Sequence, residues 1–277
     1  MRLTVSNADY LAEQFTRHNY EWPPSGTGMV PPLEVASLPD DLEAQVVKAK
    51  KSIFFRAMLP LVLAENRQIE MKRRWIIEQF ASGDVLRGTT SWGALHQIAN
   101  YYRVKGDLNE IKVRRELLRR VDTLPVALVL AQAAQESGWG TSRFARQGNS
   151  LFGEWTFAKG AGITPDERLD GRSHTVRAFP TLRASVRSYI HNLNVNRAYR
   201  ELRAMRENMR DAGQPLNAHV LASGLKRYSE RGERYVRDIR TMIKSNGLDR
   251  LGEVRMASGT VKDEPWMTVP VVSLGFL

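Results

Sequence analysis

The chain has 277 residues, enough for one large domain or two small ones. It contains no cysteine, which excludes disulfide bonds, thiolate catalysis and cysteine-ligated metals. Lys and Arg outnumber Asp and Glu by 41 to 30, and the net charge of +11 favours polyanionic partners such as nucleic acid, acidic membranes or an anionic glycan.

Several classes of partner lack support in the sequence. No apolar run approaches the roughly 20 residues of a transmembrane helix, and the start, MRLTVSNADYLAEQF, lacks the apolar core of a signal peptide. Zinc-finger spacings and RNA-binding aromatic motifs are missing, so we expect no nucleic-acid partner. Because metal-ligand spacings and phosphate-binding glycine loops are also missing, we expect no metal and no cofactor. The oligomeric state is not indicated.

The amino-acid composition of the chain changes near residue 37. The stretch EWPPSGTGMVPPLEV is rich in proline and glycine, which predicts an extended arm or linker over residues 1–36. Apolar residues then recur at helical spacing over residues 39–83, where Pro60 is expected to kink or divide the helix. Further helices are predicted over residues 91–104 and 109–121.

The next segment, DTLPVALVLAQAAQES, predicts a central helix, because it is apolar on almost every side. Asp122 or Thr123 can cap its start, and Pro125 fits the first turn. Gly138 can end the helix, which places Glu136 in the last turn.

The sequence pattern changes again over residues 154–179, where glycines separate short segments. Within them, SHTVRAF shows the alternating pattern of a β-strand. We expect a small β-hairpin flap there. Residues 251–277 show no clear period and are expected to form a tail. Helices are predicted between flap and tail over residues 181–194, 198–213, 217–228 and 233–247.

Glu136 is the most informative single residue. The unpaired carbonyl groups at a helix end disfavour a carboxylate, and apolar groups such as Trp139 and Phe152 would further raise its pKa. A carboxyl group that stays protonated suits glycosidic cleavage, because the leaving oxygen must receive a proton. The flat rings of Trp139 and Phe152 could also stack on pyranose rings. The residues alone leave open that Glu136 is an ordinary surface carboxylate.

The stretch LAQAAQESGWGTSRFARQGNSLFGEW resembles the signature of the glucosaminidase domain of glycoside hydrolase family 73, found in peptidoglycan hydrolases. The segments YIHNLNVNRAYRELR and RYSERGERYVRDIRTMI are similar to the Bax-type branch of this group in Gram-negative bacteria. The resemblance covers residues 44–247. The positions that match the signature are Ala131, Gln132, Glu136, Ser137, Gly138, Trp139, Gly140, Asn149, Leu151, Phe152 and Gly153.

The resemblance implies a mainly α, lysozyme-like two-lobed domain with a small β-hairpin flap, in which Glu136 is the general acid. Tyr228 matches a tyrosine that orients the sugar's N-acetyl group or polarises water, although a packing role for its ring is the alternative. A second carboxylate is expected from the flap, with Glu167 preferred over Asp166 and Asp170. It would act as a base or as a nucleophile, unless the substrate's own acetamido oxygen attacks. The residues expected to bind substrate are Gln132, Trp139, Asn149, Phe152 and Tyr235.

The implied activity is that of a peptidoglycan hydrolase, an endo-β-N-acetylglucosaminidase that cleaves the β-1,4 bond after N-acetylglucosamine in glycan strands. A lytic transglycosylase and a non-catalytic wall-binding protein are the alternatives. The substrate implies the periplasm or cell envelope, although no signal peptide is seen. The expected segments are an arm (1–36), a helical region (37–120), a glucosaminidase catalytic core (121–250) and a C-terminal tail (251–277).

Overall fold

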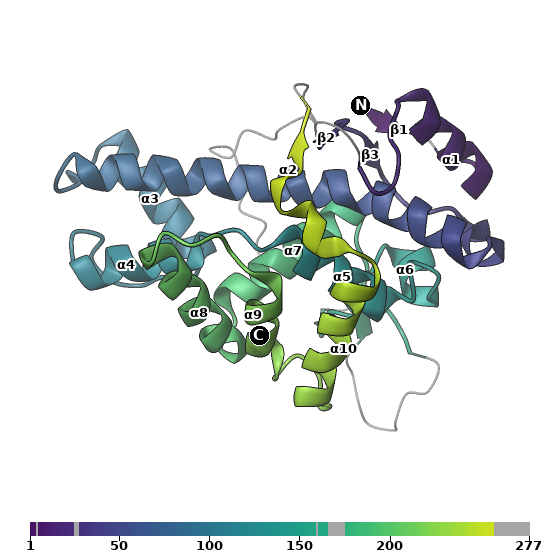
Figure 1. Ribbon diagram of the computed structural model, residues 1–277. Helices are drawn as coiled ribbons and strands as arrows, with labels where there is room; N and C mark the ends of the chain where they lie inside the picture. The colour runs from purple at the N-terminus through teal and green to yellow at the C-terminus, as the bar shows by residue number, and fades with distance from the viewer. Residues whose placement is uncertain (4, 25–27, 159, 166–174, 258–277) are drawn as a thin grey trace.

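The computed structural model describes residues 1–3, 5–24, 28–158, 160–165 and 175–257 (Figure 1). Helices dominate these residues and the strands are short. The fold class expected from the sequence is confirmed. The chain forms a mainly α, lysozyme-like domain in which the helical body is one lobe and a small β flap is the other.

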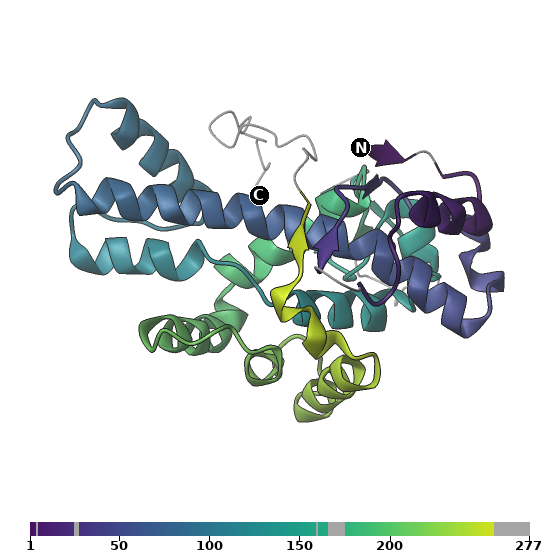
Figure 2. The ribbon, with the colours of Figure 1, turned by 45° about the horizontal axis from the view of Figure 1, so that its top comes forward.

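Helix α2 (Val47–Ala81) crosses the width of the molecule (Figure 1). Its residues 53–62 are buried in succession, because other helices and the N-terminal segment surround this part. Helices α3 (Thr90–Tyr101) and α4 (Ile111–Arg120) lie beside its C-terminal half (Figure 2). Pro60 does not divide α2, which continues through it as one helix. The burial around Pro60 compensates for the backbone hydrogen bond that proline removes.

Helix α5 (Val126–Ser137) is the centre of the C-terminal half of the chain, with residues 127–134 buried. It packs against α2 on one side and α10 (Glu233–Ser245) on the other. As expected, Gly138 ends α5 in a left-handed conformation, with φ of 57°. The helices that complete this half are α7 (Leu182–Val195), α8 (Arg200–Asp211) and α9 (Ala218–Ala222).

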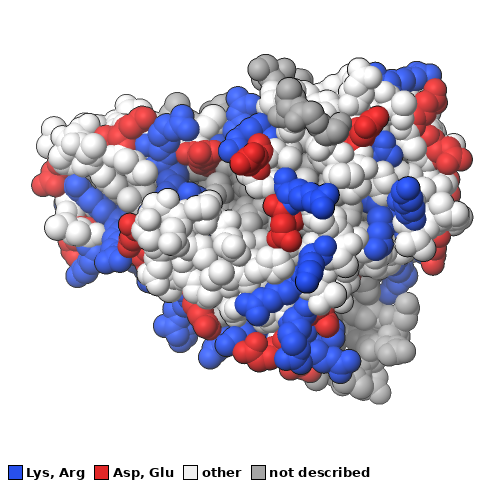
Figure 3. Space-filling model, in the orientation of Figure 1, with Lys and Arg blue, Asp and Glu red and all other residues white. Residues whose placement is uncertain are grey.

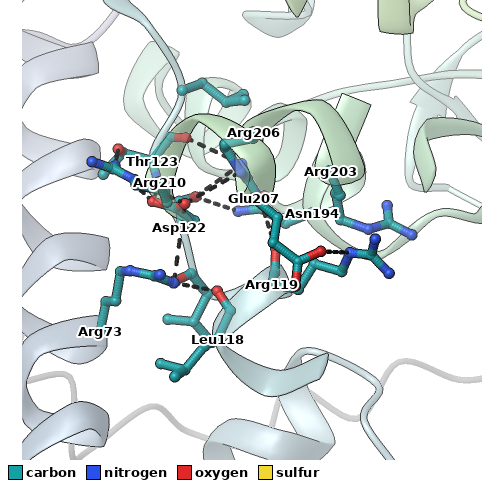
Figure 4. Close-up of polar contacts among 12 residues, drawn as sticks. Arg73, Leu118, Arg119, Asp122, Thr123, Asn194, Arg203, Arg206, Glu207 and Arg210 are labelled. Carbon is teal, nitrogen blue, oxygen red and sulfur yellow. Dashed lines mark hydrogen bonds and ion pairs between the residues drawn. The ribbon is translucent and has the colours of Figure 1, made fainter. Parts of the chain in front are cut away.

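The expected side-chain cap at the start of α5 is wrong. Pro125 occupies the N-cap position, and no side chain accepts a hydrogen bond there. Asp122 instead binds arginines from other helices (Figure 4): its two carboxylate oxygens accept from Arg210 at 2.8 and 3.2 Å, and Arg206 lies 3.5 Å away. Arg73 of α2 approaches to 4.0 Å. We call Asp122 and these three arginines the Asp122 cluster.

The flap follows α6 (Arg143–Gly148) and contains three short strands rather than a simple hairpin. Strand β6 lies between the other two and is antiparallel to both, with Val176 opposite Trp155 and Ile163. The backbone N–H of Phe179 donates to Gly148 O at 2.7 Å and so ties the end of the flap to α6. The strands are β4 (Trp155–Thr156), β5 (Gly162–Ile163) and β6 (Thr175–Arg177).

The N-terminal residues do not form the extended arm expected over residues 1–36. Helix α1 (Ala8–Arg17) is capped by Asn7, and its Leu11 and Phe15 are fully buried. These side chains remove apolar surface from water, which fixes α1 to the body. The strands in this part are β1 (Arg2–Leu3), β2 (Met29–Val30) and β3 (Glu34–Val35), of which β1 and β3 pair in parallel.

The start of the expected C-terminal tail also belongs to the body. Strand β7 (Arg255–Met256) pairs in parallel with β2, so the end of the described chain lies beside the N-terminal segment. Residues 258–277 lie outside the described residues. The short 3₁₀ helices are η1 (Asp40–Ala44), η2 (Arg197–Tyr199), η3 (Ser223–Leu225) and η4 (Leu248–Glu253).

Charged side chains cover much of the surface. On the face in Figure 3, Lys and Arg are spread among Asp and Glu rather than gathered into one basic patch. In the described part of the chain, no helix combines the length and the hydrophobicity needed to cross a membrane.

Candidate active site

Glu136 lies in the last turn of α5 and is half-buried. The hydroxyl of Tyr235, on α10, donates a hydrogen bond to Glu136 Oε1 at 2.7 Å. Gln132 lies one turn earlier on the same face of α5, and its Nε2 donates to the Tyr235 hydroxyl at 2.8 Å. Gln132 Oε1 in turn accepts from the hydroxyl of Tyr189. The carboxyl group of Glu136 is therefore held by a chain of hydrogen bonds that starts in the core.

This environment changes the acidity of Glu136. Burial raises the pKa of its carboxyl group, because a charged form loses hydration there. The hydrogen bond from Tyr235 and the charge of Arg231 lower the pKa and offset only part of this effect. The net shift is upward, which is the direction that a proton donor needs.

Trp139 packs against the helical body. Its ring lies edge-on to Phe54 and Phe55 of α2, with centroids 5.9 and 5.3 Å away, and Lys51 Nζ lies 4.5 Å from the ring centroid. Trp139 itself adopts a left-handed conformation, with φ of 63°. These contacts give the Trp139 ring a structural role, and they do not support the expected stacking on sugar.

Phe152 and Asn149 also have contacts within the protein. The Phe152 ring is 3% exposed and stacks on Tyr189 at 3.9 Å between centroids, so it offers no open face to a sugar. Asn149 ends α6 in a left-handed conformation, and its Nδ2 donates to Phe179 O at 3.1 Å. Gln132 is likewise fully buried, and Tyr235 is the expected binding residue whose side chain is hydrogen-bonded to the carboxyl group of Glu136.

Four tyrosines border Glu136, and we call Tyr189, Tyr199, Tyr228 and Tyr235 the tyrosine cluster. Tyr228 stacks on Tyr235 with centroids 5.4 Å apart, and it lies 6.1 Å from Tyr199 and 6.4 Å from Tyr189. Its hydroxyl donates to the carbonyl oxygen of Phe152 at 2.9 Å. Tyr228, which was expected to be catalytic, therefore binds the backbone carbonyl of Phe152. Tyr235 instead lies beside Glu136.

The second carboxylate expected from the flap cannot be located at Glu167, because residues 166–174, with Asp166 and Asp170, lie outside the described residues. The described flap has another candidate, Glu154, which directly precedes β4. Its Oε2 accepts a hydrogen bond from Ser188 Oγ at 2.8 Å, and its buried Oε1 has no hydrogen-bond partner among the described residues.

Glu154 is electrostatically linked to the same site. Burial raises the pKa of Glu154, and the hydrogen bond from Ser188 and the charge of Arg177 offset part of this shift. Burial raises the pKa of Tyr199 to about 12, to which the charges of Glu154 and Glu136 both contribute. Glu154 is not among the carboxylates expected from the sequence, although it directly follows the NSLFG motif.

The described residues contain no group of three or more His, Asp or Glu side chains that could hold a metal ion. The charges of two carboxyl groups, Glu136 and Glu154, act on Tyr199 of the tyrosine cluster, and carboxyl groups are suited to proton transfer.

Comparisons with known proteins identify the family of the chain. The family model of glucosaminidase, described as mannosyl-glycoprotein endo-beta-N-acetylglucosaminidase, matches residues 112–248, which contain the site. The chain is 34% identical over 212 residues to Protein bax of Escherichia coli (strain K12), a match that covers 76% of this chain and 75% of that protein. No solved structure shows a significant match. These similarities support a glycosidase with a glycan substrate. The chain belongs to the glucosaminidase family and is a Bax-type member of it.

Proposed function

We propose that this protein is an endo-β-N-acetylglucosaminidase that hydrolyses the β-1,4 bond after N-acetylglucosamine in peptidoglycan. The observation that carries this proposal is the Glu136 carboxyl group, half-buried, with a raised pKa and fixed by Tyr235. A glycosidase needs a carboxyl group that keeps its proton near neutral pH and hands it to the departing oxygen.

The hydrogen bond from Tyr235 selects the oxygen that carries the proton. Because the Tyr235 hydroxyl donates to Oε1, that oxygen acts as an acceptor, and the acidic proton belongs on Oε2. Gln132 fixes the direction of the Tyr235 hydroxyl by donating to its oxygen. The chain of hydrogen bonds therefore orients the proton donor before substrate arrives.

The flap offers the aromatic surface that Trp139 and Phe152 do not. Trp155 is 58% exposed and Phe157 is 76% exposed, and both lie within a few residues of Glu154. Trp155 lies on β4 and Phe157 directly follows this strand, and we infer that the two exposed rings form one aromatic platform. We assign this platform to stacking on the pyranose rings of the glycan strand.

The net charge of the protein and its proposed substrate both indicate where the enzyme acts. Peptidoglycan carries carboxylates on its peptide stems, and a net charge of +11 favours association with such a polymer, within the limits of salt screening. The proposed substrate implies a location in the periplasm or elsewhere in the cell envelope.

Digestion of purified sacculi followed by mass spectrometry tests the function. We expect fragments with reducing N-acetylglucosamine ends, and a loss of about 100- to 10,000-fold in rate for Glu136→Gln. Glu78→Gln, an exposed residue on α2, is the matched control and should cleave as the wild type does. Anhydromuramic ends would identify a lytic transglycosylase instead. Binding without cleavage by the wild type would identify a wall-binding protein.

A further inference from the structure

We propose that Glu154 is the second catalytic carboxylate, the base that takes a proton from the water molecule attacking the anomeric carbon. This inference rests on the proposed glycosidase function and assigns the residue that the flap segment 166–170 was expected to supply. It makes the enzyme an inverting hydrolase.

The position of Glu154 is fixed from two elements. The backbone N–H of Arg177, on β6, donates to Glu154 O at 2.7 Å, and Ser188 of α7 donates to its Oε2 at 2.8 Å. Arg177 Nη1 also donates to Ser188 Oγ at 3.1 Å, which orients the serine hydroxyl toward the carboxylate. Long acidic side chains at a surface otherwise sample several rotamers. These hydrogen bonds restrict the Glu154 side chain to one position, as a catalytic role requires.

The other carboxylate oxygen provides the second observation. Glu154 Oε1 is buried and has no hydrogen-bond partner among the described residues. A buried carboxylate oxygen without a donor is costly, so native proteins satisfy almost all such atoms. A water molecule that donates to Oε1 would satisfy it, and that water is the nucleophile of the proposed reaction.

The tyrosine cluster connects the two carboxyl groups. Glu136 bonds to Tyr235, Tyr235 stacks on Tyr228, and the Tyr228 hydroxyl bonds to the carbonyl of Phe152, two residues before Glu154. The charges of both carboxylates also raise the pKa of Tyr199, a member of this cluster. The two acids therefore adjoin one cluster from different elements, Glu136 from the end of α5 and Glu154 from the start of the flap.

The reaction balances with these two groups. The water oxygen forms a bond to the anomeric carbon while the bond from that carbon to the bridging oxygen breaks. Glu154 Oε1 takes one proton from the water, and Glu136 Oε2 gives one proton to the departing oxygen. Glu154 ends protonated and Glu136 ends ionised, and proton exchange with solvent restores both. The new reducing end carries the inverted configuration.

The test compares Glu154→Gln with Glu78→Gln on a soluble glycan that the wild type cleaves. We expect kcat to fall about 100- to 10,000-fold for Glu154→Gln, with KM little changed. In the pH profile of kcat, the acid limb reports the base and the alkaline limb reports the acid. Glu154→Gln should therefore lose the acid limb and keep the alkaline limb.

Two further variants separate catalysis from structure. Ser188→Ala removes a hydrogen bond that lowers the pKa of Glu154, so the acid limb should move to higher pH. Glu154→Asp keeps a carboxylate and should retain the acid limb at a reduced rate. These two variants decide the question if Glu154→Gln fails to fold, as judged by circular dichroism.

The outcomes are distinct. Inversion of the product, seen by nuclear magnetic resonance during cleavage, together with the lost acid limb supports the proposal. A folded Glu154→Gln that keeps both limbs overturns it, as does a product of retained configuration. If the wild type releases no reducing ends from sacculi, the proposed function itself fails, whatever the Glu154 variants do.

Discussion

At the scale of single residues, the buried side chain of Gln132 orients the residues around Glu136. Its amide is fully buried and uses both ends, with Nε2 on Tyr235 and Oε1 on Tyr189. A buried amide that is fully paired holds its partners in one arrangement. The direction of the Tyr235 hydroxyl, and with it the proton of Glu136, is therefore set from inside the protein.

Removing the Tyr235 hydroxyl tests this arrangement. The hydrogen bond from Tyr235 lowers the pKa of Glu136, so Tyr235→Phe should raise that pKa and move the alkaline limb of kcat to higher pH. The maximal rate should fall, because the carboxyl group loses its orientation. The measurement is the pH profile of kcat, with Tyr10→Phe, an exposed residue of α1, as the control. An unmoved alkaline limb would show that Tyr235 does not act on the titrating group.

Glu136 should also lower the stability of the enzyme near neutral pH. Its pKa is raised in the folded state, so as pH rises the unfolded chain loses this proton at a lower pH than the folded protein does. The free energy of unfolding therefore falls as pH rises from the unfolded pKa to the folded pKa. Glu136→Gln should remove this fall and raise stability near neutral pH, by up to about 1 kcal/mol because the group is partly exposed. Thermal unfolding at neutral and acid pH measures the effect. Equal shifts at both pH values would exclude ionisation as its cause.

The aromatic platform on the flap makes a separate prediction. Trp155→Ala should raise KM several-fold and leave kcat nearly unchanged, because stacking on a distant ring contributes equally to ground state and transition state. Steady-state kinetics on soluble glycan fragments measures both constants. Leu86→Ala, at an exposed apolar residue that follows α2, is the control and should change neither. A fall in kcat alone would instead place Trp155 at the reacting sugar.

The residue proposed as the acid can be expected from the sequence, but the contacts of the residues around it cannot, for a physical reason. Glu136 follows from local chemistry, since its place at a helix end can be read from neighbouring residues. The burial of Phe152 depends on Tyr189, and the partner of Tyr235 is almost 100 residues away. Such contacts have no local signal, so the motif identified the important residues without showing which of them touch the acid.

At the scale of elements, the turn after α5 depends on a segment far away in sequence. Gly140 has φ of 80°, and a Cβ atom there would lie 2.1 Å from Leu38 Cδ1. The N-terminal segment is thus pressed against the turn that follows Glu136. Trp22 extends this contact, because it stacks on Phe55, which touches Trp139.

Gly140→Ala tests the contact between these elements. The added methyl group requires a left-handed alanine and displaces Leu38, which should cost about 2 to 4 kcal/mol in the free energy of unfolding. Leu38→Ala makes room, so the double variant should be more stable than the sum of the single changes, by about 1 kcal/mol or more. Urea unfolding of the four proteins measures this coupling. Strict additivity would mean that backbone strain at Gly140, not Leu38, dominates.

Helices were more predictable than strands. The periods of α4, α7, α8 and α10 can be read directly from apolar spacing. Helix α1 was missed because the proline-rich residues 21–35 dominated the interpretation, although Ala8, Leu11 and Phe15 already have helical spacing. The parallel pairs β1–β3 and β2–β7 have two residues per strand, too few to produce a pattern.

At the scale of the whole molecule, the Asp122 cluster joins α2, the start of α5 and α8. Asp122 is 2% exposed, and Arg73 and Arg206 also donate to backbone carbonyls between residues 118 and 123. The sequence shows Asp122 as a possible helix cap and gives no sign of this role, because its partners come from residues 73 and 206–210. The cluster fixes the start of α5, the helix whose last turn contains Glu136.

Asp122→Asn should therefore destabilise the whole fold, by about 3 kcal/mol near neutral pH, because buried arginines lose their counter-charge. Burial alone would raise the pKa of Asp122, but Arg206, Arg210 and Arg73 hold it below its ordinary value. With a depressed folded-state pKa, the stabilisation is present above the unfolded pKa of about 3.9 and is lost as pH falls through the folded value. The difference between wild type and variant in urea unfolding should shrink toward acid pH. Asp211→Asn, at an exposed ion pair with Arg115, is the control and should cost less than about 1 kcal/mol. A deficit for Asp122→Asn that stays constant with pH would assign the effect to packing, because a lost charge interaction must disappear once the wild-type carboxylate is protonated.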